Sequence, residues 1–425
     1  MRTFSDKKTL TYMLTNSGSK GFAAVAQLYA IFVFTKMHAR DDAATIFLLL
    51  GYAIWLQVFE FGLAQTLQNK FNAKLVTSRG MLQIIIIHFI MMVIIAVIII
   101  TTPLLTALLL PDSQTGLSGE SAVAFSLGAS ILIIASNNVI TQRFLLIFSK
   151  GNLGNMLIMS QSLLSILGLA FYDLVGSPQL VFGVLLYLGP QILVYVPLLI
   201  GFIKKLLSRG SRQSKSSFRS VLVDTLSFWG LGVMSVLYLG ADYYFVAHYL
   251  KAEQIVSYHV VTRLFFISYV VYYSFLMYRV RRLSVVKLEN DARGVFLIYK
   301  DSVVIGLLWV LTIFCLGICL GQVGIFRALT NGVGISPMLM FSALLYFTVR
   351  VCRDVAAVIT AGLSARKTLY LAYLIELIVG PSLMFLLVPK LGGEGVFVSM
   401  SLASMLGLIP MICNAKKIGN QYLCA

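Results

Sequence analysis

The sequence predicts an all-α polytopic membrane protein with twelve transmembrane helices in two six-helix halves. Three observations indicate this class. Twelve apolar blocks with short connections are each long enough to cross roughly 30 Å of hydrocarbon at about 1.5 Å per helical residue. A mean hydropathy of +0.91, with 59% hydrophobic and 12% charged residues, excludes an ordinary soluble domain. The basic residues are concentrated in alternate connections.

The basic residues also predict how the chain is oriented in the membrane. The N-terminus, every second connection and the C-terminus together hold 24 of the 33 lysine and arginine residues. The opposite connections hold four, which are Arg40, Lys251, Arg327 and Lys390. This positive-inside pattern predicts that both termini are cytoplasmic. The net charge of +17 then reflects contact with anionic headgroups, and nucleic acid is not an expected partner.

Six blocks form the first half: 17–37, 43–66, 81–102, 122–142, 154–172 and 180–203. The first is too long for a signal-peptide core and has no small-residue cleavage site, so we expect it to remain as a span. Asp41 and Asp42 are interpreted as N-capping and first-turn acids of the second. The connection at 103–121 is too short for a soluble catalytic domain. Pro190 permits a kink in the sixth span.

The segment 204–220 separates the two halves. It contains six basic residues, six serines and no acid, which is typical of a flexible cytoplasmic linker. The sequence therefore predicts an N-terminal half at 1–203, a linker at 204–220 and a C-terminal half at 221–425. Duplicated transporters use such a 6+6 arrangement, with a substrate path between the halves.

The second half is predicted from blocks 221–246, 256–278, 301–320, 336–360, 368–388 and 391–414. Asp242 closes the first of these blocks, and Arg263 lies about two turns into the next from the same side. The two residues could pair across the helix hairpin, and an ion pair that ties the helices would explain both. His259 is interpreted as a packing residue. Pro381 and Pro410 permit kinks in the last two spans.

The tenth block carries the strongest functional signal. Arg350, Arg353 and Asp354 share one helix face, within about 100° of arc. Each charge near mid-bilayer costs roughly 2.5–3.5 kcal/mol, so this face must point to protein or water. One interpretation is structural: Arg350 and Asp354, four residues apart, neutralise each other and leave Arg353 over. The other is a face that binds substrate or gates its path. The sequence leaves both open.

Three further charged residues lie within spans: Lys20, Glu60 and Glu376. A carboxylate in a transporter cavity can bind a proton or sodium ion and couple transport to a gradient. Alternatively, Glu60 and Lys20 could pair near the cytoplasmic surface. The sequence contains no nucleotide-binding loop and no metal-binding motif, so we expect no cofactor.

Several of these residues also occur in motifs that resemble a known family. The run FEFGLAQTLQNKFNAK at 59–74 is similar to the second-helix signature of the oligosaccharide flippases that move O-antigen units. These form the polysaccharide transporter branch of the multidrug/oligosaccharidyl-lipid/polysaccharide exporter superfamily. The matching positions are Glu60, Gly62, Leu63, Gln68 and Asn69.

Two further motifs extend the resemblance over essentially the whole chain. Asp242, Tyr258 and Arg263 resemble the family's spaced Asp, Tyr and Arg, and 387–403 resembles its Gly-rich entry to the last helix. The chain departs from the pattern where the eighth span ends in YRVRRL, without the proline that many relatives carry there.

The resemblance implies a flippase of the bacterial inner membrane, not an enzyme, that moves an undecaprenyl-diphosphate-linked oligosaccharide by alternating access. Its expected partners are this lipid, membrane lipids, and a polymerase and chain-length regulator of the same pathway. The cations available for the diphosphate or for anionic sugars are Arg350, Arg353, Arg263 and Lys20. The candidates for ion coupling or a gate are Glu60, Asp242, Asp354 and Glu376.

Two other functions remain open. A drug or cation exporter of the same superfamily would share the architecture, but acids should then dominate its cavity. A polysaccharide polymerase or glycosyltransferase could use Asp41 and Asp42 as catalytic carboxylates. Such enzymes need long outer loops, which this chain lacks.

Overall fold

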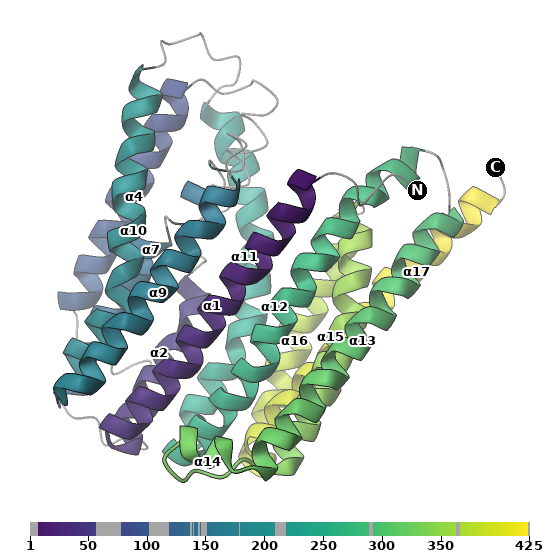
Figure 1. The fold of residues 1–425 in the computed structure, drawn as a ribbon. Coiled ribbons are helices and arrows are strands. Elements are labelled where there is room, and N and C mark those ends of the chain that lie inside the picture. The colour runs from purple at the N-terminus through teal and green to yellow at the C-terminus, as the bar shows by residue number, and fades with distance from the viewer. Residues whose placement is uncertain are drawn as a thin grey trace. The chain divides into compact units, whose positions relative to one another are not determined.

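In a computed structural model, the chain forms two compact units (Figure 1). The N-terminal unit is Met1–Val236 and the C-terminal unit is Leu237–Ala425. The structure describes residues 7–56, 78–101, 119–136, 138, 140–142, 145, 151–177, 179–208, 218–288, 292–362 and 366–423.

Among the described residues, six helices build the N-terminal unit up to the 204–220 segment. In chain order they are α1 (Lys7–Met37), α2 (Arg40–Leu56), α4 (Ser78–Thr101), α7 (Gly119–Ala135), α9 (Gly151–Val175) and α10 (Leu180–Ser208). Helix α1 packs along α9, and α7 packs against α2, α4 and α10. Asp41 and Asp42 lie in the first turn of α2, as predicted. The predicted N-capping role is wrong, because the helix already begins at Arg40 and the Ala39 carbonyl accepts from the Ala43 N–H.

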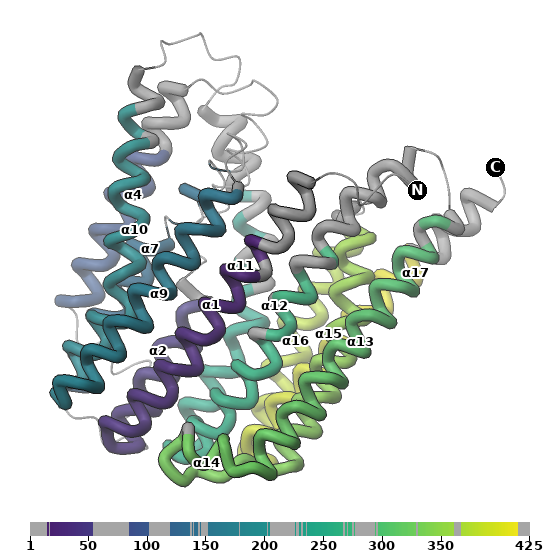
Figure 2. Tube along the Cα trace, in the orientation of Figure 1, coloured from purple at the N-terminus to yellow at the C-terminus, as the bar shows by residue number. Residues whose placement is uncertain are grey.

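The C-terminal unit takes up the chain within α11 (Phe218–Tyr249). The helices that follow are α12 (Ala252–Leu288), α13 (Ala292–Gln322), the short α14 (Ile325–Leu329), α15 (Pro337–Gly362), α16 (Arg366–Leu391) and α17 (Gly393–Leu423). Helix α15 contacts α12, α13, α16 and α17, and α16 lies along α17 (Figure 2). Each of the twelve predicted spans overlaps a helix in the described part of the chain, which confirms the all-α fold.

The helix surfaces suit a lipid environment. Seven segments of the described residues are long and apolar enough to cross a membrane. The segment Phe296–Gln322 of α13 has the highest hydropathy, yet only 22% of it is buried. Leu308 and Leu311 are among its exposed side chains. An apolar helix face left uncovered by protein is what hydrocarbon accommodates.

In the N-terminal unit, polar side chains near the connection between α1 and α2 link these helices to α7, α9 and α10. Lys36, in the last turn of α1, pairs with Asp173 of α9 at 2.7 Å. Nearby, His38 Nε2 lies 2.6 Å from the Tyr172 hydroxyl, which donates to the Gln179 carbonyl at 3.0 Å. The contacts that involve α7 are Glu120 Oε1 with the Leu180 N–H and Ser121 Oγ with Asp42. These contacts hold the ends of the helices together at one end of the unit.

The link between α16 and α17 is a glycine turn, as its composition predicts. Gly392 has φ of +62°, a left-handed conformation that favours glycine. At Gly395 an added Cβ would lie 2.7 Å from the Leu387 carbonyl oxygen, so only glycine permits this close approach. The two helices can therefore pack closely from this turn onward.

Candidate functional site

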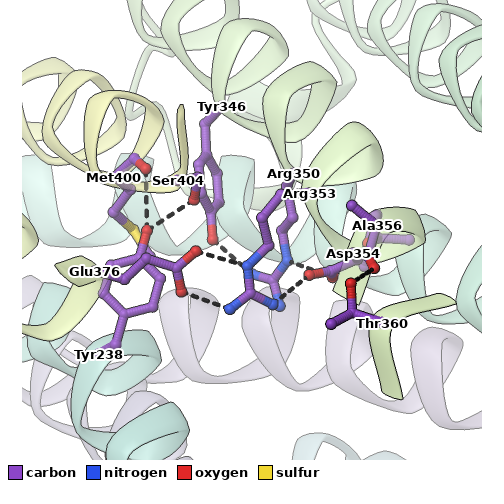
Figure 3. Close-up of polar contacts among 11 residues, drawn as sticks. Tyr238, Tyr346, Arg350, Arg353, Asp354, Ala356, Thr360, Glu376, Met400 and Ser404 are labelled. Carbon is purple, nitrogen blue, oxygen red and sulfur yellow. Dashed lines mark hydrogen bonds and ion pairs between the residues drawn. The ribbon is translucent and has the colours of Figure 1, made fainter. Parts of the chain in front are cut away.

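The charged residues of α15 form a compact cluster with one acid from α16. Arg353 donates from Nε to Glu376 Oε1 at 2.6 Å and from NH2 to Glu376 Oε2 at 2.5 Å (Figure 3). The Arg353 guanidinium also lies over the Tyr373 ring, 4.5 Å from its centroid. Glu376 is fully buried. This two-donor geometry is the strongest form of an arginine–carboxylate pair.

Asp354 connects the two arginines. Its Oδ1 accepts from Arg353 NH1 at 2.8 Å, and its Oδ2 accepts from the Tyr269 hydroxyl at 2.6 Å. Arg350 Nε also approaches Oδ2, but at 3.4 Å, which is long for a hydrogen bond. Asp354 is therefore bound more tightly to Arg353 and Tyr269 than to Arg350.

Arg350 is held by aromatic rings and keeps one nitrogen available. Its NH1 donates to the Tyr346 hydroxyl at 2.6 Å, and its guanidinium lies 5.1 Å from the Tyr269 ring centroid and 5.6 Å from that of Tyr346. Among the described residues, its NH2 nitrogen has no hydrogen-bond partner. In the described part of the chain, the side-chain nitrogen or oxygen atoms that are both buried and without a hydrogen-bond partner are Thr262 Oγ1 and Ser302 Oγ. Arg350 NH2 has no partner but is not one of these atoms, so it retains accessible surface.

The helix geometry explains how the cluster forms. Tyr346, Arg350 and Asp354 are spaced four apart on α15 and therefore lie along one face. Glu376 faces α17 at Gly407, where an added Cβ would lie 2.5 Å from Oε1. Glycine at this position thus makes room for the buried carboxylate.

The positive and negative charges of the cluster balance, but the two arginines differ in how many of their donors are bonded. Two guanidinium groups meet two carboxylates, so the burial of these charges is compensated. The structural interpretation left Arg353 without a partner, whereas all three of its nitrogens are bonded. Arg350 is the arginine with unused donor capacity, and it could bind an anion.

A second polar group surrounds Asp242 at the end of α11. The Tyr258 hydroxyl donates to Oδ2 at 2.7 Å, and the Tyr243 N–H donates to Oδ1 at 2.8 Å. Two residues of the spaced Asp, Tyr and Arg motif thus contact each other. Asp242 is only 4% exposed, and its hydrogen-bond donors are neutral groups. It is therefore a buried carboxylate without a salt bridge among the described residues.

Arg263 lies on α12 beside this group, next to His259, which was interpreted from the sequence as a packing residue. Arg263 Nε donates to His259 Nε2 at 3.4 Å, while His259 Nδ1 lies 2.8 Å from the Tyr243 hydroxyl. Because arginine can only donate, His259 Nε2 must accept and its proton must lie on Nδ1. The contact between Arg263 and His259 joins α12 internally, four residues apart.

The remaining predicted site residues belong to the N-terminal unit. Lys20 lies on α1 and is half-buried. Glu60 and the motif at 59–74 lie outside the described residues, as does the middle of the predicted linker. Whether Lys20 and Glu60 pair stays a prediction.

Sequence reasoning missed the two tyrosines that hold Arg350. Tyr346 precedes Arg350 by four residues, and this spacing alone could have identified it. Tyr269 lies 85 residues before its partner Asp354, and no local pattern points to that contact.

No protein-family model and no curated protein matches the sequence. Solved structures do match its fold. One is an inward-facing multidrug resistance MATE family transporter of the MOP superfamily, with a TM-score of 0.72 and 14% identity over 94% of this chain and 96% of that one. A second is the lipid II flippase MurJ in an inward closed conformation, with a TM-score of 0.71 and 16% identity over 97% of this chain and 91% of that one.

A third similar structure is a MOP superfamily transporter from Pyrococcus furiosus, for which the reverse polarity of the binding pocket suggests a different function. Its TM-score is 0.66, with 14% identity over 97% of this chain and 96% of that chain. At these identities the likenesses show the fold. The chain thus has the fold of these transporters along nearly its whole length.

Proposed function

We propose that the chain is a flippase that carries a lipid-linked, diphosphate-bearing oligosaccharide across the bacterial inner membrane, with undecaprenyl diphosphate as the lipid carrier. Both termini are then cytoplasmic, and the halves at 1–203 and 221–425 rock about the 204–220 linker. The oligosaccharide needs a polar path and the diphosphate needs cations, while the lipid tail can remain in the bilayer.

The observation that carries this proposal is the state of Arg350. It lies near the middle of α15, where a charge is costly, and it retains an unbonded NH2 nitrogen among the described residues. A planar guanidinium with free N–H donors suits a phosphate oxygen. Arg353 then has a structural part, because Glu376 and Asp354 occupy its nitrogens.

A drug or cation exporter of the same fold is the principal alternative. The fold does not separate the two, since a multidrug transporter and a lipid flippase match with similar TM-scores of 0.72 and 0.71. The charges favour the flippase. In the described α15 cluster both carboxylates are paired with arginine, so neither is available to a cationic drug.

Asp242 is the carboxylate best suited to ion coupling. It is buried and held by neutral donors, so it could gain a proton or cation without first breaking a salt bridge. Asp354 and Glu376 are already paired with arginine. Coupling through Asp242 would make transport depend on an ion gradient.

Deleting the gene tests the class of function. We expect polymer at the cell surface to stop while lipid-linked units persist on the cytoplasmic side. If single units reach the outer face unpolymerised, the protein is a polymerase and the proposal is wrong.

Substitution of Arg350 tests the site. Arg350→Ala should abolish surface polymer at normal protein abundance, and Arg350→Lys should restore it in part. The double variant Arg350→Ala/Asp354→Ala leaves Arg353 paired with Glu376 and keeps the cluster neutral. It should remain inactive. Recovery of transport in this variant would show that Arg350 serves only as the partner of Asp354.

A further inference from the structure

We propose that the Tyr346 hydroxyl is a second donor to the oxyanion bound by Arg350, so that the two residues form one anion-binding pair on α15. This inference rests on the proposed function and names a further residue of the same site. The ligand group is a phosphate oxygen of a diphosphate. The structural basis is the direction of the hydrogen bonds at the two tyrosines of the cluster.

The Tyr346 hydroxyl accepts a hydrogen bond and keeps its own proton. Arg350 NH1 lies 2.6 Å from this oxygen, and an arginine nitrogen can only donate. The hydroxyl proton must therefore point elsewhere. Within the described part of the chain Tyr346 makes no other hydrogen bond, so no protein acceptor takes this proton.

Tyr269 shows the opposite arrangement in the same cluster. Its ring also lies on the Arg350 guanidinium, but its hydroxyl donates to Asp354 Oδ2 at 2.6 Å. A carboxylate oxygen can only accept, so the Tyr269 proton is already used. Of the two tyrosines, only Tyr346 can offer a donor to a ligand.

The unused donors of Tyr346 and Arg350 lie close together. Tyr346 and Arg350 are one helical turn apart on α15, and the hydroxyl binds NH1, which shares its carbon with the unbonded NH2. A tetrahedral phosphate presents several oxygens and can accept from both groups. The contact between Arg350 NH1 and the hydroxyl also polarises the O–H bond, which makes Tyr346 a better donor.

The test measures binding by the full chain in lipid nanodiscs. The probes are farnesyl diphosphate, inorganic diphosphate as a lipid-free anion, and farnesol as the uncharged lipid. Removing the hydroxyl in Tyr346→Phe should weaken farnesyl diphosphate binding by about tenfold, the usual size of one charge-assisted hydrogen bond. Farnesol binding should not change. If the site recognises only the anion, Tyr346→Phe should weaken the binding of inorganic diphosphate by the same factor.

Tyr238→Phe is the matched control. Tyr238 is also buried in the C-terminal unit, and its hydroxyl binds the Met400 carbonyl at 3.0 Å and Ser404 Oγ at 2.9 Å rather than Arg350 (Figure 3). This variant should bind farnesyl diphosphate with the wild-type affinity. If it also loses tenfold, the effect of Tyr346→Phe is a general loss of packing and the inference is wrong.

A second binding measurement keeps the Tyr346 hydroxyl and changes only its strength as a donor. Placing 3-fluorotyrosine at position 346 makes the hydroxyl a stronger donor and a weaker acceptor. Binding should tighten if Tyr346 donates to the anion, and it should stay equal or weaken if Tyr346 only accepts from Arg350. Unchanged binding in both variants, with loss in Arg350→Ala, overturns the inference but leaves the proposed function standing. Unchanged binding in Arg350→Ala overturns the site itself.

Discussion

Arg353 of α15 and Glu376 of α16 meet through two parallel hydrogen bonds, with no water-exposed surface on the carboxylate. The pair joins two helices through their most buried charges. Since neither charge can be left alone in the interior, its loss should affect folding more than ligand binding.

Removing one member of this pair should therefore destabilise the protein. Glu376→Gln leaves Arg353 with a weaker partner, and breaking a buried pair typically costs about 3–5 kcal/mol. We expect lower abundance and a lower melting temperature in detergent. The double variant Arg353→Met/Glu376→Leu should recover much of the loss. Asp173→Asn, which removes the exposed pair with Lys36, is the control and should cost at most about 1 kcal/mol.

Gly407 should be intolerant of the smallest substitution. In a helix, alanine is normally about 1 kcal/mol more favourable than glycine. Here the added Cβ would lie 2.5 Å from Glu376 Oε1 and would push the carboxylate away from Arg353. Gly407→Ala should lower the melting temperature. Gly201→Ala, where an added Cβ meets nothing within 4 Å, should raise it or leave it unchanged. Equal changes in melting temperature in the two variants would contradict the close contact between position 407 and Glu376.

Asp242 should determine the response to an ion gradient. Asp242→Asn removes the charge but preserves a hydrogen-bond acceptor for Tyr258. If Asp242 binds the coupling ion, transport by this variant in vesicles should no longer respond to an imposed proton or sodium gradient. Tyr258→Phe keeps the charge and should still respond. A full gradient response in Asp242→Asn would exclude Asp242 as the coupling site.

His38, in the connection between α1 and α2, should make stability depend on pH. Burial lowers the pKa of His38 below its usual value near 6.5, and the carboxylates Asp42 and Glu120 oppose this only in part. The unfolded chain therefore takes up the proton first, so stability is present at neutral pH and falls as the pH drops below about 6.5. Melting temperatures at about pH 7.5 and pH 5.5 measure this loss. His38→Gln should reduce the difference, and an unchanged difference would assign it to other groups.

The sequence predicted the helices well and their side-chain partners poorly. Long apolar runs set the helix positions, because hydrocarbon requires every backbone group to be bonded within the segment. Helical periodicity likewise placed Arg350, Arg353 and Asp354 on one face. It could not reveal that Glu376, 23 residues from Arg353, would occupy that face, because a period identifies a face and not the helix that packs on it. The same limit hid the contact between Tyr269 and Asp354.

The ties between α1 and α9 have a consequence for biogenesis. Thr15 accepts a hydrogen bond from Asn155, 140 residues later, and Lys36 binds Asp173, 137 residues later. At ribosomal elongation rates of about 5–20 residues per second, roughly 7–28 s separate the synthesis of the two members of each pair. During this interval the first span must remain beside the translocon or in lipid while these polar groups lack their partners on α9. The N-terminal unit can therefore close only when its fifth span is delivered, and a nascent chain halted before residue 150 should be a preferred substrate for membrane quality control.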